Sequence, residues 1–499
     1  MGEKMLSILV QFLLDRKILL NAKKIAVLRQ KSEAELSFFF ESIKDKESEE
    51  IRQRLEDLFE EKKDTSLSSS ERAAEKSKEG SVSVLTSFES KEVSKKVGDF
   101  VSYFNARYKA IEKMLRNRQE LQSMTAMRRL AQKEEREPVS VIGIVKEIEL
   151  TKNENIIIIL EDQTGETKVL VSKSKKELYM EGKSIVRDEI IGVIGVSGKG
   201  IIFAEKIIWP DVPVYNELKK APEEEYALFL SDIHVGSKQF LAKSFEKFIK
   251  WINGGLGDEK QRELVKKVKY IFIVGDIVDG VGVYPSQEND LEILNIFDQY
   301  KECAKLIAQI PVHIKIIITP GNHDAMRLAE PQLPLYEDIA KPLYDLSNVM
   351  MLSNPAMVTL AKSETFPGIN VLLYHGYSFD YYIANVDEIR NNGGYDRADL
   401  VMKFLLKRRH LAPTHASCVY IPFAENDPMV ISKIPDIFAT GHLHKTSVST
   451  YRNITLLCGS CWQGKTAFQE KMGHNPEPGR VPAVNLQTRE VKILRFGEE

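Results

Sequence analysis

Short apolar runs that end in tight turns recur throughout the C-terminal half of the chain. Five of them lead directly into an Asp, Asn or His side chain, at residues 226–230, 270–274, 314–318, 371–374 and 436–440. Apolar runs of this length that stop at a turn are typical of buried strands, and helical patterns at 240–252 and 291–310 alternate with them. We therefore predict that residues 210–499 form an α/β domain in which helices cover a central sheet.

The pattern upstream of this domain is different. Residues 138–209 contain five short strand-like segments, and a connection long enough for a helix follows the third of them. This arrangement predicts a small OB-fold β-barrel. Such barrels often bind single-stranded nucleic acid through exposed aromatic side chains, which are scarce in this segment. We therefore expect the barrel to be a docking module more than a nucleic-acid platform.

Three segments precede the barrel. Residues 1–63 repeat apolar positions at helical spacing and predict a small helical N-terminal domain, either a binding site for a partner protein or a self-contained bundle. Residues 64–96 are rich in Ser, Lys and Glu and predict a flexible linker. Residues 97–137 are predicted to be a helical basic segment, with one helix over about 97–132. Its basic residues, Arg107 among them, suit a solvated helix face better than a nucleic-acid contact.

Composition limits the classes of function. Hydrophobic residues make up 43% of the chain, and the formal net charge is −2, so any affinity for nucleic acid must come from local basic surface. Four cysteines are too few for a disulfide framework and indicate a cytoplasmic protein. We interpret the C-x-x-C pair Cys458 and Cys461 as strand-end thiols and not as a zinc site. Residues 6–20 predict neither a signal peptide nor a membrane span, because polar and charged residues interrupt them.

The side chains that follow the five predicted strands are of the kinds that bind divalent metal ions. Hydrolysis at two metal ions needs several carboxylate, amide or imidazole ligands, and ideally one carboxylate that bridges both ions. The candidate ligands are Asp232, His234, Asp276, Asn322, His375, His442 and His444. Oxygen and nitrogen ligands without a thiolate suit manganese, magnesium, iron or zinc, and we expect two manganese ions. A single histidine is usually structural, but five such turns in one domain predict a hydrolytic metal centre.

The five turns carry the motifs D-x-H, G-D-x-x-D, G-N-H-D, a strand-end histidine and G-H-x-H. With these motifs in this order, residues 226–445 resemble the calcineurin-like metallophosphoesterase superfamily. The resemblance implies a first ion held by Asp232, His234 and His444. It implies a second ion held by Asn322, His375 and His442, with Asp276 bridging the two.

The same resemblance gives neighbouring residues a catalytic role. It implies that His323 lies beside the reacting phosphate, where it stabilises the developing charge or protonates the leaving oxygen. Asp324 or Asp279 would orient its imidazole. An ester oxygen that leaves near neutral pH needs a proton, so the chemistry agrees with this role.

The order of the domains narrows the resemblance. Together with residues 280–285, 408–413 and 462–469, it resembles the small subunit of archaeal family D DNA polymerase, related to the B subunits of eukaryotic replicative polymerases. The resemblance implies a 3′→5′ exonuclease that proofreads DNA at single-stranded or mismatched 3′ ends. It also implies a heterodimer with a large catalytic subunit and no membrane partner. Two alternatives stay open: a non-catalytic scaffold subunit, and another phosphoesterase such as a small-substrate or protein phosphatase.

Two further features could contact DNA or the large subunit. The basic cluster at residues 407–410 could hold a DNA phosphate near the site, or could be a charged helix end that points to water. Trp462 and Phe468 belong either to the surface that faces the large subunit or, as we prefer, to the core.

Overall fold

The chain divides into two compact units, Met1–Glu79 and Gly80–Glu499. The structure is a computed structural model, and it describes residues 11–13, 16, 39–40, 43–44, 51, 82–89, 95–130, 133, 135–423, 425–466, 469–470 and 475–497. The predicted helical N-terminal domain therefore lies outside the described residues, apart from a few positions. Among the helices of the described part, none has the length and apolar character needed to cross a membrane.

Two six-stranded sheets form the centre of the larger unit. The first has the order β10-β9-β8-β7-β16-β17 and consists of β7 (Tyr226–Leu230), β8 (Val268–Val274), β9 (Lys315–Thr319), β10 (Val349–Met351), β16 (Arg480–Asn485) and β17 (Val491–Arg495). The second has the order β1-β11-β12-β13-β15-β14 and consists of β1 (Ser83–Thr86), β11 (Ala356–Leu360), β12 (Ile369–Leu373), β13 (Ile437–Thr440), β14 (Ser447–Tyr451) and β15 (Ile454–Cys458). The five strands predicted to carry candidate ligands are thus confirmed as β7, β8, β9, β12 and β13.

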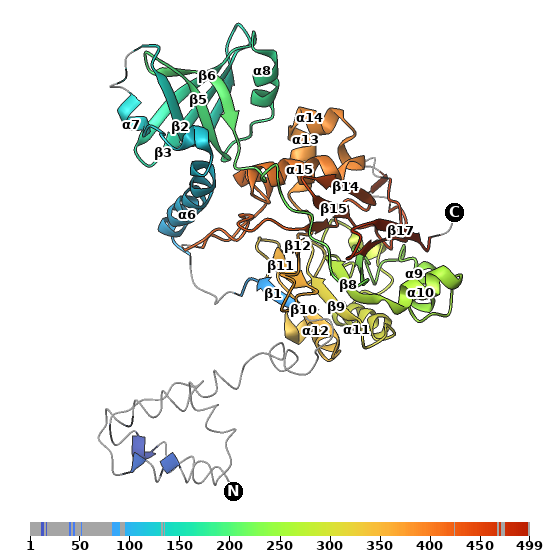
Figure 1. Ribbon diagram of the computed structural model, residues 1–499. Helices are drawn as coiled ribbons and strands as arrows, with labels where there is room; N and C mark the ends of the chain where they lie inside the picture. Colours follow the sequence, from blue (N-terminus) through green and yellow to red (C-terminus); the bar gives the residue numbers. More distant parts are fainter. Residues whose placement is uncertain are drawn as a thin grey trace. The chain divides into compact units, whose positions relative to one another are not determined.

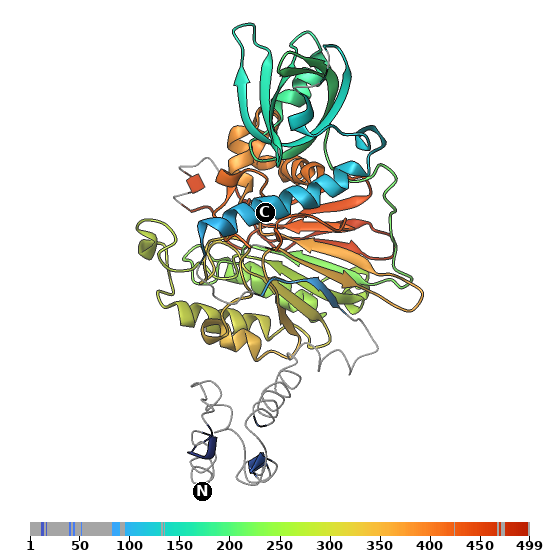
Figure 2. The ribbon, with the colours of Figure 1, turned by 90° about the vertical axis from the view of Figure 1, so that its left-hand side faces the viewer.

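The two sheets pack face to face, and Figure 2 shows them as stacked layers. Their shared core contains Phe229 and Phe272 from the first sheet, whose rings are parallel with centroids 4.8 Å apart. Val371 and Leu457 face them from the second sheet. Because both faces of these strands are covered, every residue of β7 and β12 is buried, which explains their unbroken apolar runs.

Helices cover the outer face of each sheet (Figure 1). The first sheet packs against α9 (Ala242–Ile252), α10 (Glu259–Lys266), α11 (Ile296–Ile307) and α12 (Glu337–Tyr344). The second packs against α13 (Phe379–Asn385), α14 (Asp387–Asn391) and α15 (Ala398–Arg408). Short 3-10 helices η2 (Gln287–Asn289), η3 (Gly394–Asp396) and η4 (His415–Ser417) lie in the connections. The predicted α/β architecture is confirmed, with two central sheets in place of one.

Strand β1 corrects the prediction of a linker over residues 64–96. Ser83–Thr86 pairs antiparallel with β11 and forms the edge of the second sheet. Phe88 then packs its ring 4.4 Å from that of Phe423, and its backbone N–H donates to Ser353 Oγ at 2.7 Å. Four residues are too few to show a strand period within a serine-rich stretch, so the sequence pattern missed this element.

The predicted five-stranded barrel is confirmed. It closes in the order β2-β3-β4-β6-β5, with β2 (Pro138–Leu150), β3 (Ile156–Asp162), β4 (Gly165–Val171), β5 (Ile190–Gly198) and β6 (Ile201–Ile208). Helix α8 (Lys176–Lys183) occupies the connection after the third strand. Valine and isoleucine side chains that alternate along these strands fill the interior.

The predicted helix over residues 97–132 is shorter in the structure. It divides into α6 (Val97–Arg116), η1 (Gln119–Leu121) and α7 (Met127–Leu130). Helix α6 packs Tyr108, Ile111 and Leu115 against the barrel. Arg107 was expected on a solvated face, but it is 3% exposed and pairs with Asp427 at 2.6 Å.

Both interpretations of the basic cluster at 407–410 are wrong. Arg408 is buried and forms an ion pair with Glu189 of the barrel. Arg409 is buried and donates to the backbone carbonyls of Ile431 and Ser432. His410 is buried and lies 2.7 Å from a carboxylate oxygen of Asp427. Arg408, Arg409 and His410 thus hold the barrel and the connecting segments together and are not available to DNA, whereas Lys407 is partly buried with its ammonium 3.8 Å from the centroid of the Trp209 ring.

Candidate metal centre

The candidate ligands converge at one edge of the two-sheet core. Strands β7, β8 and β9 run parallel to one another, as do β12 and β13, so their carboxyl ends point the same way. Four of these strands end two residues before a candidate ligand, and β9 ends three residues before Asn322, with a Pro-Gly turn between them. Loops beyond the carboxyl ends of parallel strands are where α/β folds place their ligand sites.

Several candidate ligands have a backbone conformation that is unusual for residues other than glycine. Positive φ angles between 51° and 71° occur at Asp232, His234, Asp276, His442 and His444. Each such residue costs about 1–3 kcal/mol, and the cost is tolerated where the surrounding structure fixes a functional side chain. The sharp turns aim these side chains into one space.

Glycines in the same loops allow the backbones to approach closely. At Gly275, with a φ of +82°, an added Cβ would lie 2.3 Å from His375 Nδ1. At Gly321 it would lie 2.3 Å from Asp276 Oδ1. A side chain at either position would therefore displace a candidate ligand.

The first group of candidate ligands consists of Asp232, His234 and His444, all buried. His444 Nε2 lies 3.4 Å from Asp232 Oδ1 and 3.0 Å from His234 Nε2. These two imidazole nitrogens can share one proton in a hydrogen bond, or both can offer a lone pair to one cation. With the Asp232 carboxylate beside them, the donors fit a metal ion.

The second group consists of Asp276, His375 and His442. His375 Nε2 lies 3.2 Å from Asp276 Oδ2 and 3.0 Å from Asn322 Oδ1. The structure therefore brings all seven predicted ligands together, divided into groups that match the expected first and second ions. The Asp276 carboxylate of this second group also accepts the backbone N–H of His323 at 2.7 Å.

Each imidazole in these groups has its other ring nitrogen engaged by a partner. The pairs are His234 Nδ1 with Asp279 Oδ1 at 3.0 Å, His375 Nδ1 with the Val274 carbonyl at 2.9 Å, His442 Nε2 with Asp380 Oδ2 at 2.9 Å and His444 Nδ1 with the Gln469 amide at 2.9 Å. Metal-binding histidines are characteristically held in this way, because the partner fixes the ring orientation. The sequence analysis missed Asp380 and Gln469, which lie outside the strand-end turns.

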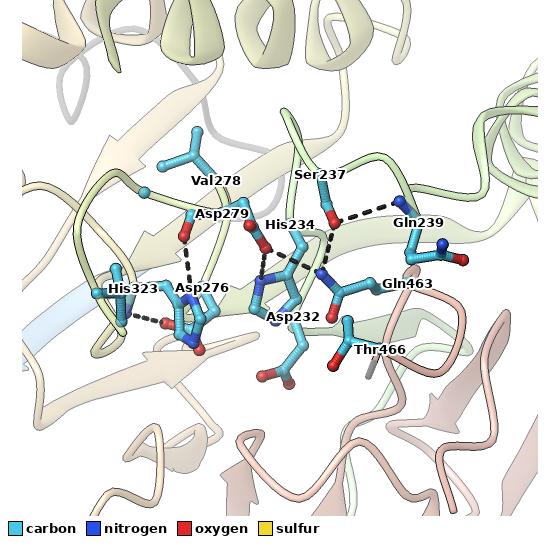
Figure 3. A network of polar contacts seen from close by, with 12 residues as sticks. Asp232, His234, Ser237, Gln239, Asp276, Val278, Asp279, His323, Gln463 and Thr466 are labelled. Atoms are coloured by element: carbon cyan, nitrogen blue, oxygen red, sulfur yellow. Dashed lines mark hydrogen bonds and ion pairs between the residues drawn. The ribbon is translucent and has the colours of Figure 1, made fainter. Parts of the chain in front are cut away.

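The role expected for Asp279 and Asp324 needs correction. His323 Nδ1 donates to the backbone carbonyl of Asp279 at 2.8 Å and to neither carboxylate. The Asp279 carboxylate instead accepts from Gln463 at 2.9 Å, and it orients His234 (Figure 3). It also accepts from Gln287 at 3.1 Å. A third possible metal group, His234, Asp279 and His323, therefore has its carboxylate already engaged.

Asp324 is a buried support of the loop that carries Asn322 and His323. It accepts the Gly321 N–H at 2.8 Å and faces the Tyr300 hydroxyl at 3.4 Å. Burial, reinforced by the negative charge of Asp276, raises the pKa of Asp324 to about 7. Asp324 therefore holds the loop and does not touch the His323 ring.

The charges within the site are strongly interdependent. Burial opposes the charged form of Asp276, but neighbouring imidazoles, His375 foremost, hold its pKa well below the usual range. Burial likewise opposes the charged form of His375, yet Asp276 raises its pKa to about 10. A proton on His375 can thus offset the charge of Asp276, and a divalent cation bound here would displace that proton.

Two other predictions concern the loop after β15. Trp462 is 1% exposed and packs its ring 4.8 Å from that of Phe245, so its assignment to the core is confirmed. Phe468 lies outside the described residues. Cys458 and Cys461 are buried thiols beside the site, and burial raises the pKa of each to about 12.

Comparison with known proteins adds relatives that match most of the chain. The DNA polymerase II small subunit of Methanothermobacter thermautotrophicus is 40% identical over 401 residues, which span 80% of each chain. The proteins of the same name from Archaeoglobus fulgidus and Pyrococcus furiosus are 40% and 39% identical over 400 residues, or 80% of this chain. The matches span 77% and 63% of those two relatives.

A family model for the B subunits of DNA polymerases alpha and epsilon matches residues 227–449. This range begins in β7 and ends in β14, so it contains all the candidate ligands. Among solved structures, an archaeal phosphodiesterase aligns with 54% of this chain and 99% of its own, at 12% identity. The TM-score of that alignment is 0.27, too low to support an inference.

Proposed function

Because the chain belongs to the DNA polymerase II small subunit family, we propose that it is the proofreading 3′→5′ exonuclease subunit of a two-subunit replicative DNA polymerase. Its partner would be a large subunit that carries the polymerase activity. Its substrate would be the single-stranded or mismatched 3′ end of a growing DNA strand. The arrangement of ligands around Asp276 is the observation that carries the proposal.

The donor set fits two divalent ions, with Asp232, His234 and His444 at one, Asn322, His375 and His442 at the other, and Asp276 between them. When bound, such ions would polarise a phosphodiester and activate water for hydrolysis. A donor set of oxygen and nitrogen without thiolates suits manganese, magnesium, iron or zinc, and we propose manganese, as expected from the sequence. A scaffold that had lost its enzymatic role would not need four imidazoles individually fixed by hydrogen bonds, which speaks for an active centre.

His323 is the residue proposed to act on the reacting phosphate. Its Nδ1 proton is held by the Asp279 carbonyl, so Nε2 is the nitrogen left for a substrate. Burial lowers the pKa of His323, although Asp276 opposes that effect. An anionic phosphodiester beside the ring would favour the protonated form, and the proton could then pass from Nε2 to the leaving 3′ oxygen.

The test is degradation of 5′-labelled DNA by the purified full-length chain, alone and with the large subunit. Single-stranded and mismatched-primer substrates are compared, with manganese and with a chelator. We expect a ladder that shortens from the 3′ end and disappears with the chelator. His323→Ala should slow cleavage by about 10²- to 10⁴-fold, the usual contribution of a proton-transfer residue.

His313→Ala is the matched control, because His313 is an exposed histidine of the same domain, outside the candidate site. It should cleave like the unmodified chain. Asp276→Ala should lose cleavage yet still assemble with the large subunit. If neither preparation cleaves DNA under any metal condition, the proposal fails and the scaffold alternative replaces it.

A further inference from the structure

A cleft with aromatic walls opens beside the candidate metal centre. It has a volume of about 530 Å³. Its described lining includes Phe100 of α6, Tyr377, Asp380 and Tyr381 at the start of α13, and Tyr420 after η4. Phe100 is 39% exposed, and the three tyrosines are partly exposed. We call this feature the aromatic cleft.

The aromatic cleft touches the metal centre through two of its residues. Asp380 Oδ2 lies 2.9 Å from His442 Nε2, and the ring centroid of Tyr377 lies 6.1 Å from that of His442. A DNA strand whose terminal phosphodiester is held at the centre would therefore place neighbouring nucleotides at the mouth of the cleft.

The side chains that line the aromatic cleft suit the bases of a nucleic acid better than its phosphates. None of the described residues that line the aromatic cleft is Lys or Arg, and the acidic side chain Asp380 would repel a phosphate. Tyrosine and phenylalanine rings stack on unpaired bases of any sequence. Paired bases already stack on one another in a duplex, so the cleft suits a frayed or single-stranded end.

Contacts with buried residues hold the Tyr420 wall of the aromatic cleft in place. Tyr420 stacks on Tyr103 with ring centroids 5.1 Å apart and an interplanar angle of 16°. Tyr103 is anchored in turn, because its hydroxyl donates to Asp427 at 2.7 Å in a buried contact. A preorganised wall loses little side-chain entropy when a base binds against it.

We propose that the aromatic cleft binds the unpaired bases at the 3′ end of single-stranded DNA, by stacking, while the terminal phosphodiester lies at the metal centre. This inference rests on the proposed nuclease function, since it names how that site takes its substrate. It makes strand separation at the 3′ end a condition of binding, so a mismatched end enters more readily than a paired one.

The first test measures binding without cleavage. An oligonucleotide with 2-aminopurine at its 3′ end is titrated with the full-length chain in chelator, and a second probe carries the fluorophore at its 5′ end. Fluorescence should be quenched for the 3′ probe and unchanged for the 5′ probe. Tyr381→Leu and Phe100→Leu, which keep apolar volume but remove a ring, should weaken the affinity about tenfold.

Tyr215→Leu is the control for this test, because Tyr215 is 97% exposed and does not line the cleft. It should bind both probes like the unmodified chain. A melting curve of each variant confirms folding before the titration. Equal quenching of both probes, or affinities that do not depend on Tyr381 and Phe100, would overturn the inference.

The second test measures cleavage in manganese on oligonucleotides whose last two nucleotides are normal or abasic. In the unmodified chain the abasic ends should raise KM by about tenfold or more for the loss of stacked bases. In Tyr381→Leu the two substrates should differ much less. Cleavage that ignores the missing bases overturns the aromatic cleft alone, whereas absence of all cleavage overturns the nuclease proposal.

Discussion

Asp380 shows how much of the centre depends on residues that are not ligands themselves. Its carboxylate accepts from His442 Nε2, and its removal would free the His442 ring to rotate. We expect Asp380→Ala to weaken metal binding about 10- to 100-fold, the usual cost of losing such a partner. The measurement is the manganese concentration that gives half of the metal-induced rise in melting temperature.

Asp380→Asn should recover part of the loss, because the amide oxygen can still accept the hydrogen bond although the charge is gone. Asp387→Ala on α14 is the control, since Asp387 is exposed and pairs only with Arg390 among the described residues. An unchanged manganese midpoint in Asp380→Ala would show that the neighbouring backbone alone fixes His442.

The buried, neutral state of His410 should make the free energy of unfolding depend on pH. Its Nε2 donates to Asp427 while its Nδ1 accepts the Ala412 N–H at 2.9 Å, so both nitrogens are satisfied only in the neutral form. Burial, aided by the positive charge of Arg107, lowers the pKa of His410 to about 4. Between its ordinary value of about 6.5 and this value, the unfolded chain binds a proton that the folded chain does not. Stability should therefore fall as pH falls through this window.

The measurement is urea unfolding at pH 7 and pH 5, for the unmodified chain and for His410→Gln. His410→Gln should be less stable at pH 7, but it should lose about 1–2 kcal/mol less between the two pH values. His415→Gln alters an exposed histidine and should behave like the unmodified chain. A pH dependence identical in all three proteins would contradict a neutral His410.

The candidate ligands could be predicted because each lies in the turn after a strand. The end of an apolar run is visible in the sequence, and the ends of parallel strands lie together in the fold. Asp380, Gln463 and Gln469 carry no such signal, since they come from a helix and a loop that only tertiary packing brings to the centre. Asp279 was predicted as a site residue, but its contacts were not. Sequence cannot tell whether a carboxylate or its own backbone carbonyl meets a given imidazole.

At the scale of elements, β1 is the part of the second sheet with no sequence signal. It covers the edge of β11, whose five residues are all buried. A chain that begins at residue 80 should keep the stability of the larger unit, because it retains β1. A chain that begins at residue 90 should lose about 2 kcal/mol or more, the net value of several hydrogen bonds and contacts. Urea unfolding compares the two truncated chains.

The shorter of these chains should also associate at high concentration, since an unpaired strand edge is a template for another strand. Light scattering of the two truncated chains at equal concentration shows whether the shorter one associates. If both chains unfold alike and stay monomeric, β1 is dispensable and the second sheet is complete without it.

The strands that carry ligands were predictable because, unlike β1, they have a clear apolar pattern in the sequence. Burial on both faces gave them unbroken apolar runs, which are readable without knowing their neighbours. The end of α6 at Arg116 was not readable, because the apolar positions continue beyond it in η1 and α7. The apolar residues after Arg116 pack against the barrel without continuing the spacing of helix α6. Leu121, for example, lies in one buried cluster with Ile190.

At the scale of the whole larger unit, residues of the barrel hold in place the segment that lines one side of the aromatic cleft. The Thr414 hydroxyl donates to the Arg187 carbonyl at 3.1 Å, and the His415 N–H donates to Asp188 Oδ2 at 2.8 Å. Arg187 and Asp188 belong to the barrel, and His415 lines the cleft. The barrel thus has a positioning role toward the proposed substrate site.

The ion pair of Glu189 and Arg408 secures this arrangement. Burial raises the pKa of Glu189 even beside Arg408, and burial lowers the pKa of Arg408, so desolvation opposes both charges. Removing one partner of such a pair leaves the other charge buried and unpaired, which costs about 3–5 kcal/mol. We expect a loss of this size in the unfolding free energy for Arg408→Met and for Glu189→Gln.

The double variant Glu189→Gln with Arg408→Met should recover much of that loss, because it leaves no buried charge. Arg187→Met is the matched control, since Arg187 is exposed and lies 3.5 Å from its partner Glu147, and its effect should be much smaller. Costs that simply add in the double variant would contradict the pairing. Coupled costs, together with a weaker 2-aminopurine signal in Arg408→Met, would link barrel docking to the aromatic cleft, because loosening the barrel would release the segment that His415 contributes to it.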